Sequence, residues 1–480
     1  MKFNKKIAVA VSGAVLLLAG QIALADSTTD IVDALVSKGV LTEEEGKLIT
    51  KGHESKKKAE GTVGFKNGFK INSGDGKSNF SVNGRIQADY RYFDTPEHPG
   101  NAGSANPSAD TFDIRRAYLG AKGTFRNFIN WEATTNVAGS SSMKYMWLEA
   151  AFSDAVKVRF GQFKPMFGLE QNTSSRFIDM TERDWVASMA PGVTRGIMIH
   201  GSPFTGVNYG LAMNTGSTAA SYMADAGEGV NDTYNNGDGK QYSANVRVNI
   251  AEIIGNKEAI MHVGGSIASD TDASKPTLGS LSFRTNARGT IFYNSGTGLG
   301  GNTIDITRAG LEGIGAYGPF KLQAEWAQMG FSNTNVAATN DKDINAWYVN
   351  ASYMLTGETY ASAYKNGLMD RMSPKADYLG LGSSGWGAWE IGLRYSKFDA
   401  TDLPVATATA GSSANADNVH SYTAGIKWIT DPNTRFMLDY VYTDFGRAIT
   451  GNLSSSAPYT IFPEARSNEK AINLRAQFDF

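Results

Sequence analysis

The last ten residues, AINLRAQFDF at 471–480, constrain the fold more than any other stretch of the chain. Apolar side chains occupy every even position from 472 to 480, and polar or charged side chains occupy every odd position from 473 to 479. A period of two is that of a β-strand with one apolar and one polar face. A strand that ends on an aromatic residue of its apolar face suits a sheet that closes against lipid. A soluble β-sandwich is the alternative at this point.

The same alternation recurs along most of the chain. Residues 79–93, 245–250, 347–355, 389–396 and 435–442 each alternate aromatic or aliphatic side chains with polar or charged ones. The mean hydropathy of −0.29 argues against a bundle of membrane helices. It is compatible with a barrel, in which only every second strand residue meets lipid. Because Tyr and Trp also gather at strand ends, as interfacial belts require, we expect an all-β fold, a transmembrane antiparallel β-barrel.

Loop lengths give the barrel a direction and a size. Long insertions rich in Gly, Ser, Asn and Asp occupy 95–111, 215–239, 399–418 and 446–468, whereas tight turns such as 430–433 separate other strands. Long loops at one end and short turns at the other are typical of outer-membrane barrels. The about 420 residues after residue 60, at roughly ten membrane residues per strand plus loops, accommodate about sixteen strands. A barrel of this size encloses an aqueous channel.

Residues 1–25 have the features of a signal peptide. A basic start at 2–6 precedes an apolar core at 7–18, and the small-residue sequence Ala-Leu-Ala at 23–25 is a cleavage site. We therefore expect export through the inner membrane and, with the barrel, a location in the outer membrane of a Gram-negative bacterium.

A short helical segment precedes the barrel. Residues 26–60 are expected to lie in the periplasm as helices up to about residue 50, with a capping box at Thr42 and Glu45, followed by a charged linker at 51–60. These helices either pair with copies from neighbouring subunits or lie free in the periplasm. The barrel is assigned to residues 61–480.

The residues that carry enzymatic chemistry elsewhere do not form such patterns here. Cysteine is absent, and the five histidines lack metal-ligand spacing. The string GIGAYG at 313–318 precedes Pro319 and a strand, so it predicts a hairpin turn rather than a dinucleotide site. His420 and Ser421 face opposite sides of a strand and cannot form a catalytic pair. We expect no enzyme activity, no cofactor and no metal site.

Charge also limits the partners. The formal net charge is −2 and becomes more negative once the signal lysines are removed, so bulk charge gives no support for a nucleic-acid partner. Any preference for anions must come from where the arginines lie.

The densest polar stretch is residues 156–201. It begins as a strand and loses its alternation at Lys164-Pro165. Because it is neither a regular strand nor a Gly/Ser-rich loop, we expect it to fold into the lumen and narrow it. It would then present Lys164, Arg176, Arg183 or Arg195 to the pore. The alternative is an ordinary exposed loop.

Several motifs give the chain a resemblance to the phosphate- and polyphosphate-selective porins of Gram-negative outer membranes. They are FSVNGRIQADY at 80–90, IRRAYLG at 114–120, VRFGQF at 158–163, FGLE at 167–170, TSS at 173–175, TER at 181–183, LTGE at 355–358, GAWEIGLRYS at 387–396, PNTRFMLDY at 432–440 and LRAQFDF at 474–480. The resemblance implies sixteen strands, a homotrimer, an inward third loop and anion conduction along pore arginines.

Carried over by residue, the resemblance implies basic pore positions at Arg85, Arg115, Arg116, Arg183 and, from an outer loop, Arg288. The chain departs from the phosphate-selective members at three positions. It has Gln171 where those members carry a lysine after FGLE. It has Ile129 and Trp147 where they place a binding lysine and aspartate.

These observations leave three functional hypotheses. The first is a passive, anion-preferring porin for small anions such as phosphate, whose guanidinium groups replace part of an anion's hydration shell. The second is a general porin, or one for sugars or organic acids, without phosphate specificity; a lumen-facing Trp147 would favour it. The third is a barrel enzyme or a structural barrel that conducts nothing.

Overall fold

The computed structural model describes residues 32–33, 35–64, 68–94, 110–138, 142–215, 240–271, 282–294, 305–332, 341–382, 384–403, 416–449 and 466–480. The expected signal peptide lies outside these residues, as do large parts of the four expected long loops. Within the described part, no helix combines the length and the apolar character needed to span a membrane.

The chain divides into two compact units. The first comprises residues 1–64 and 70–79 and contains, in its described part, α3 (Glu43–Glu60), β1 (Thr62–Gly64) and most of β2 (Phe69–Asn72). Strands β1 and β2 pair antiparallel. The second unit comprises residues 65–69 and 80–480.

Helix α3 begins as the sequence predicts and ends later. The Thr42 hydroxyl accepts the N–H of Glu45 at 3.2 Å, and the Glu45 carboxylate accepts the N–H of Thr42 at 2.9 Å. The helix then runs through residues 51–60, which we expected to be a linker without regular structure. Lys and Glu are good helix formers, so a helix nucleated by this capping box propagates through the charged stretch.

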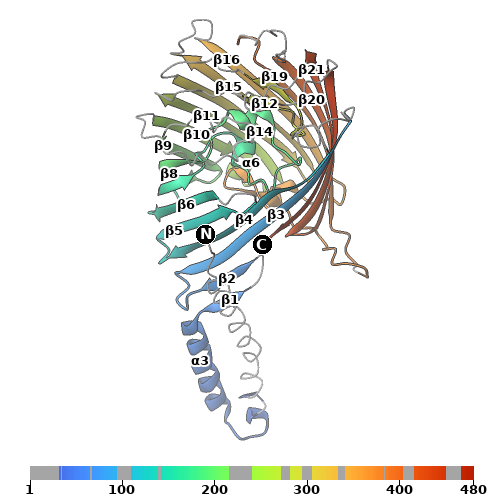
Figure 1. Cartoon of the computed structure of the whole chain (residues 1–480). Helices are drawn as coiled ribbons and strands as arrows, with labels where there is room; N and C mark the ends of the chain where they lie inside the picture. Colours follow the sequence, from blue (N-terminus) through green and yellow to red (C-terminus); the bar gives the residue numbers. More distant parts are fainter. Residues whose placement is uncertain are drawn as a thin grey trace, which may run out of the picture. The chain divides into compact units, whose positions relative to one another are not determined.

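The second unit is a closed antiparallel barrel of 16 strands (Figure 1). The barrel strands are β3 (Asn79–Phe93), β4 (Thr111–Phe125), β5 (Ile129–Asn136), β6 (Ser142–Ala151), β7 (Lys157–Phe163), β8 (Thr194–Phe204), β9 (Val207–Thr215), β10 (Lys240–Asn249), β11 (Ala259–Thr271), β14 (Asp305–Tyr317), β15 (Phe320–Ser332), β16 (Lys342–Met354), β19 (Ala388–Asp399), β20 (Asn418–Asp431), β21 (Thr434–Ile449) and β22 (Arg466–Asp479).

The C-terminal strand closes this barrel, as the alternation of residues 471–480 predicts. Strand β22 pairs with β3 from Ala471 opposite Phe93 to Asp479 opposite Arg85. Gly84 and Phe480 exchange backbone hydrogen bonds of 2.9 and 3.0 Å, which extends the ladder to the last residue. No edge is left at this junction, where the blue and red ends of the sequence meet in Figure 1.

The two faces of each strand meet different surroundings. On β22, Leu474 and Phe478 are 44% and 48% exposed on the outer surface, whereas Arg475 and Gln477 are each 2% exposed and face the interior. The arginine-bearing parity therefore points inward, as a membrane barrel with a polar lumen requires. The string at 313–318 lies in β14 and its hairpin turn, with Gly318 at φ 54°, so it does not precede a helix.

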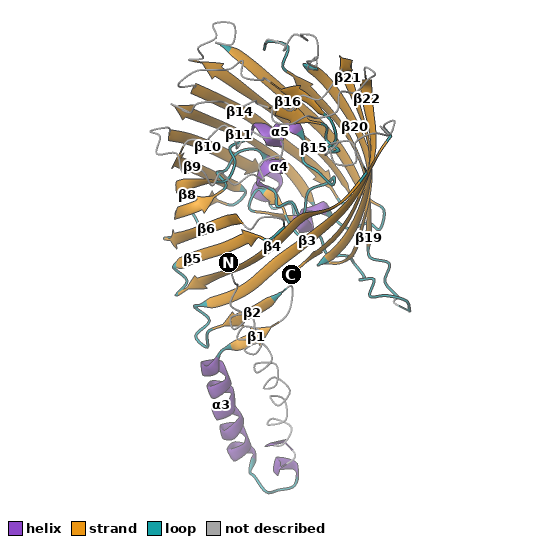
Figure 2. Cartoon of the chain, in the orientation of Figure 1, coloured by secondary structure: helices purple, strands orange, loops and turns teal. Residues whose placement is uncertain are grey.

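Three segments fold into the interior of the barrel. The inward loop, residues 164–193 between β7 and β8, contains α4 (Leu169–Asn172) and α5 (Trp185–Met189), drawn inside the ring of strands in Figure 2. The outer hairpin, residues 282–294, contains β12 (Ser282–Arg284) and β13 (Ile291–Asn294). The third is the first part of the β16–β19 segment, residues 355–387, in which Tyr360 is buried; farther along the same segment, Leu379, Leu381 and Trp386 are exposed.

The β16–β19 segment contains η4 (Tyr360–Ala363), β17 (Tyr364–Lys365) and β18 (Leu368–Met369). A further short helix, α6 (Ile250–Ile253), belongs to the β10–β11 connection.

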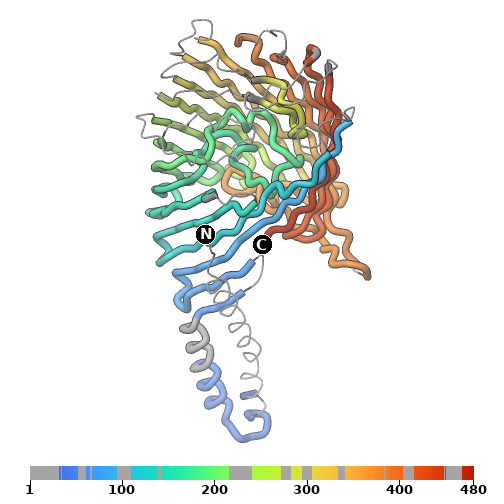
Figure 3. Tube along the Cα trace, in the orientation of Figure 1, coloured from blue at the N-terminus to red at the C-terminus, as the bar shows by residue number. Residues whose placement is uncertain are grey.

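These inward segments pack against the barrel wall through apolar cores. Trp185 of α5 lies edge-on to Phe292 of the outer hairpin, with ring centroids 5.4 Å apart, and to Phe398 of β19 at 6.0 Å. Tyr360 of the β16–β19 segment is buried in a second cluster with Leu169 of α4. Protein side chains around Trp185 and Tyr360 therefore fill part of the barrel interior. The green and orange traces in Figure 3 include the segments that carry these two residues.

Candidate functional site

The inward loop begins where the strand pattern breaks at Lys164-Pro165. A positive φ of 65° at Gly168 turns the chain into α4, whose first N–H groups would otherwise lack acceptors. The Glu325 carboxylate of β15 supplies them: it accepts the N–H of Leu169 and of Glu170, each at 2.7 Å. The first turn of the inward loop is thus bound to β15 of the barrel wall.

Glu182 fastens the other end of the loop to an arginine cluster on β3, β4 and β22. Its carboxylate accepts two hydrogen bonds from Arg115, at 2.7 and 3.1 Å, and one from Arg475 at 2.9 Å. Arg116 and Arg91 approach to 3.7 and 3.8 Å. Burial alone raises the pKa of Glu182, but the surrounding guanidinium groups hold it well below its usual range.

Two further carboxylates of the inward loop lie beside Arg394 of β19. Glu170 is 3.3 Å and Asp184 is 3.9 Å from its guanidinium group. Burial raises the pKa of both acids; for Glu170 the attraction of Arg394 only partly offsets burial, so the pKa rises to about 7. These two groups share one cation, and Glu170 therefore titrates near neutral pH.

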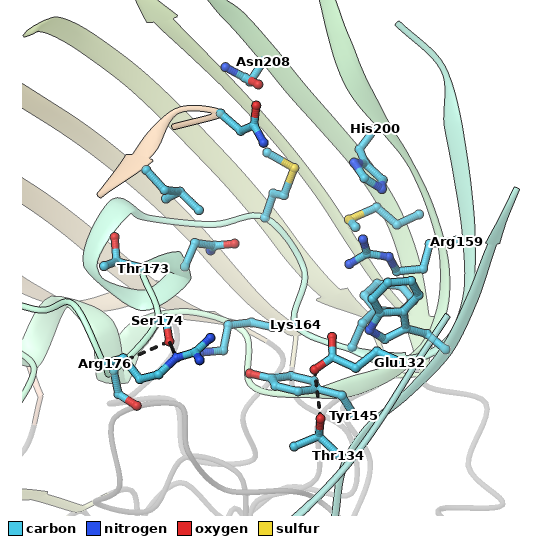
Figure 4. A pocket seen from close by; sticks show the side chains of 18 of the residues that line it. Glu132, Thr134, Tyr145, Arg159, Lys164, Thr173, Ser174, Arg176, His200 and Asn208 are labelled. Atoms are coloured by element: carbon cyan, nitrogen blue, oxygen red, sulfur yellow. Dashed lines mark hydrogen bonds between the residues drawn. The ribbon is translucent and has the colours of Figure 1, made fainter. Parts of the chain in front are cut away.

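A cavity of about 450 Å³ lies between the inward loop and the barrel wall of β3–β10 (Figure 4). Its lining is rich in cations and hydroxyl groups. The basic side chains are Arg85, Lys157, Arg159, Lys164, Arg176, Arg183 and Arg247, and the acidic one is Glu132.

The loop side of the cavity presents arginines on a hydroxyl-rich turn. Arg85 donates to Ser175 Oγ at 2.6 Å and lies 3.4 Å from Ser174 Oγ. Arg176 Nε reaches the same Ser174 hydroxyl at 3.3 Å. Two guanidinium groups therefore converge on one hydroxyl at the cavity surface, a geometry suited to a carboxylate or phosphate group.

The wall side of the cavity is aromatic. The Arg159 guanidinium lies 3.9 Å from the centroid of the Trp147 ring. Glu149 fixes Arg159 through bonds of 2.8 and 2.5 Å and also accepts from His200 at 2.8 Å. Trp147 and Met166 also pack against an apolar cluster that contains Phe163 and Met198.

A second group of arginines surrounds Phe177 of the inward loop. Arg176, Arg371 and Arg435 lie 5.2, 5.5 and 5.3 Å from the centroid of its ring. One carboxylate, Asp479, bonds Arg371 and lies 3.7 Å from Arg176. The three cations come from the inward loop, the β16–β19 segment and β21, so only the folded chain brings them together.

The structure divides the basic residues expected at the pore into three groups. Arg85, Lys164, Arg176 and Arg183 line the cavity, whereas Arg115 and Arg116 are both buried against Glu182. Their consecutive burial interrupts the strand alternation of β4.

The remaining two lie apart from the cavity lining. Arg195 of β8 donates to Gln162 at 3.0 Å. Arg288 turns the outer hairpin with φ 65° and adds to the positive charge that acts on Glu182.

The expected pore residues within the inward loop also bond to the loop itself. Arg183 donates to the carbonyl oxygens of Glu170 and Thr173 at 2.8 and 2.7 Å, and Lys164 donates to that of Gln171 at 2.8 Å. Both cations hold the loop in shape as well as adding charge to the cavity.

The three departures from the family pattern lie in different surroundings. Trp147 faces the lumen, and the Gln171 side chain is buried within the loop. Ile129 has the opposite parity to Asn130, which bonds Glu149 on the lumen side at 3.0 Å. Ile129 therefore lies on the outward face and cannot stand in for a pore lysine.

Sequence reasoning did not single out Arg159, Arg371 and Arg435 for the site. The polar parity of β7 and β21 was a usable signal for Arg159 and Arg435. Arg371 lies in an irregular segment without any periodicity, so no local signal identifies it.

Comparison with known proteins agrees with this fold. The family model described as phosphate-selective porin O and P matches residues 80–480. Porin O of Pseudomonas aeruginosa is 25% identical over 408 residues, which cover 78% of this chain and 85% of that protein.

Solved structures are more distant. An anion-selective porin from Comamonas acidovorans is 13% identical with a TM-score of 0.49 and covers 84% of this chain and 100% of its own. OmpT, an outer membrane protein of Vibrio cholerae, is 11% identical with a TM-score of 0.47 and covers 84% of this chain and 98% of its own. From the family match over the whole barrel, the chain belongs to the phosphate-selective porin O and P family, whose members are outer-membrane porins.

Proposed function

We propose that the protein is an anion-preferring channel of the outer membrane, through which small anions such as phosphate diffuse down their gradients. The observation that carries this proposal is the charge of the cavity between the inward loop and the wall. Seven Lys or Arg side chains and one carboxylate line it. Glu149, Glu312, Asp479 and Asp154 pair with four of these cations from outside the lining, while the lining itself remains predominantly basic. Walls of one sign raise the local concentration of the opposite ion.

The arginines and their counter-charges have separate roles in this mechanism. Guanidinium forks such as Arg85 and Arg176 replace part of the hydration of a passing anion. The carboxylates paired with these arginines weaken anion binding, because conduction requires that each bound ion is also released. Membership of the family supports a homotrimer, export by the segment at 1–25, and a periplasmic location for residues 26–60.

Planar-bilayer reversal potentials test the proposal. In a tenfold gradient of potassium chloride, we expect a potential of the sign set by chloride permeation. A potential of the opposite sign, or none, contradicts the anion assignment.

Liposome swelling with phosphate and with an uncharged sugar of similar size then separates an anion channel from a general porin. We expect phosphate to enter faster. Equal rates would favour the general or sugar porin.

A further inference from the structure

The cavity is far larger than an inorganic anion needs. Its 450 Å³ lies within the range of small-molecule binding sites, roughly 300–1,000 Å³. A bare phosphate or chloride ion at the Ser174 end would leave the aromatic side of the cavity to water. A water molecule occupies about 30 Å³ in the liquid, so many waters would remain.

The two sides of the cavity have different chemistry, as Figure 4 shows for Arg176 on the loop and Arg159 on the wall. At one side, Arg85 and Arg176 converge on the Ser174 hydroxyl. At the other, Trp147 and Arg159 form a stacked pair next to Met166. Glu149 holds Arg159 by two bonds, so the stacked pair is rigid before any solute arrives.

We propose that this cavity is a binding site for organic anions that combine a planar, apolar body with a single carboxylate or phosphate group. The anionic group binds Arg85 and Arg176, and the planar body lies against the Arg159–Trp147 pair and Met166. Arginine planes stack on aromatic faces, and both sides of such a plane can be used. Inorganic phosphate can contact only Arg85 and Arg176, so it leaves the cavity faster than an anion that also contacts the Arg159–Trp147 pair.

This inference rests on the anion channel proposed above and names the class of solute that the channel holds longest. Trp147 is its specificity-determining residue, because it alone among the residues just named offers a fused aromatic ring to the cavity. Arg85 and Arg176 serve every anion alike.

Block of chloride current in planar bilayers tests it with the full-length protein. Benzoate is the probe, acetate has the same carboxylate without the ring, and inorganic phosphate has the charge alone. We expect benzoate to halve the chloride current at a concentration at least about tenfold below that of acetate or phosphate, since an aromatic or cation–π contact contributes about 1–2 kcal/mol.

Substitutions at one position separate ring stacking from general effects. Trp147→Ala is expected to bring the half-blocking concentration of benzoate to within about threefold of that of acetate, whereas Trp147→Phe keeps most of the difference. Trp389→Ala is the matched control, because Trp389 stacks on Trp428 at 5.3 Å on the outward face. It should leave both half-blocking concentrations as they are.

The outcomes distinguish this inference from the proposed function. If the reversal potential reports chloride preference but benzoate blocks no better than acetate, the proposed organic-anion binding site is refuted and the anion channel is retained. The same holds if Trp147→Ala and Trp389→Ala behave alike. A channel that prefers potassium overturns both.

Discussion

Replacement of Glu182 by alanine tests whether one carboxylate holds the inward loop in the barrel. The side chain is 4% exposed, and two guanidinium groups donate to it directly while two more lie within 4 Å. Loss of one partner of a buried ion pair costs about 3–5 kcal/mol, because the remaining charges stay buried and uncompensated. At about 1.4 kcal/mol per factor of ten, loop docking weakens by two to four powers of ten.

Hydrogen exchange of the loop amides measures this change in detergent-solubilised protein. Two backbone amides of the loop report on its docking. Thr181 N–H donates to Asp439 at 2.6 Å, and Asp184 N–H donates to Glu170 at 2.7 Å. Both should lose protection in Glu182→Ala, while strand amides such as those of β21 keep theirs. Added formate should restore protection, because it fits the vacated carboxylate position and the four arginines attract it.

Glu132→Ala is the matched control for this experiment. Glu132 of β5 lines the cavity, and its carboxylate accepts from Thr134 at 2.9 Å rather than from the arginines that surround Glu182. We expect loop protection close to that of the unmodified protein. Equal protection in the two variants, or no response of Glu182→Ala to formate, would refute the role of Glu182 as an anchor.

Two further predictions concern the charge of the lumen. Because burial raises the pKa of Glu170 to about 7 from an ordinary value of 4.5, the contribution of Glu170 to docking of the inward loop is fully present below pH 4.5 and is lost as the pH rises through 7. The carboxylate gains its negative charge over the same range, so the chloride-to-potassium permeability ratio should fall between about pH 6 and 8, and Glu170→Gln should abolish that step. Arg435→Met removes one of the three cations around Phe177; at about 8 Å through water a unit charge contributes about 0.5 kcal/mol, so anion conductance should fall about twofold. Thermal stability should not fall, because two guanidinium nitrogens of the buried Arg435 have no hydrogen-bond partner among the described residues, and the neighbouring Arg176 and Arg371 repel its charge. Lys257→Gln in an exposed turn should change neither quantity.

The barrel was predictable because its information is local. Alternation identifies each strand, and the face of Arg475 and Leu474 follows directly from it. The capping box of α3 was equally readable from Thr42 and Glu45. The end of α3 was not, since a run of lysines is compatible with both a helix and a linker.

The site was only partly predictable because its information is not local. Arg115 and Arg116 were expected at basic pore positions, yet the environment of both depends on Glu182, which lies 66 residues or more away in sequence. Parity could have excluded Ile129 from the lumen, but only after the bounds of β5 were known. The turn that carries Arg371 has no period to read.

The inward loop explains why the arginines inside this barrel differ in their roles. Four arginines surround Glu182 and Asp89 and hold the loop, so these two carboxylates offset part of their positive charge. Arg85 and Arg176 instead meet the hydroxyl groups of Ser175 and Ser174 at the cavity, and Asp479, 3.7 Å from Arg176, offsets part of the Arg176 charge. The same residue type therefore anchors the loop where a carboxylate opposes it, and in the proposed mechanism it meets the solute where a serine hydroxyl does. That mechanism predicts that anion selectivity depends on which arginines the neighbouring acids neutralise, so removing a single carboxylate such as that of Glu182 should change it.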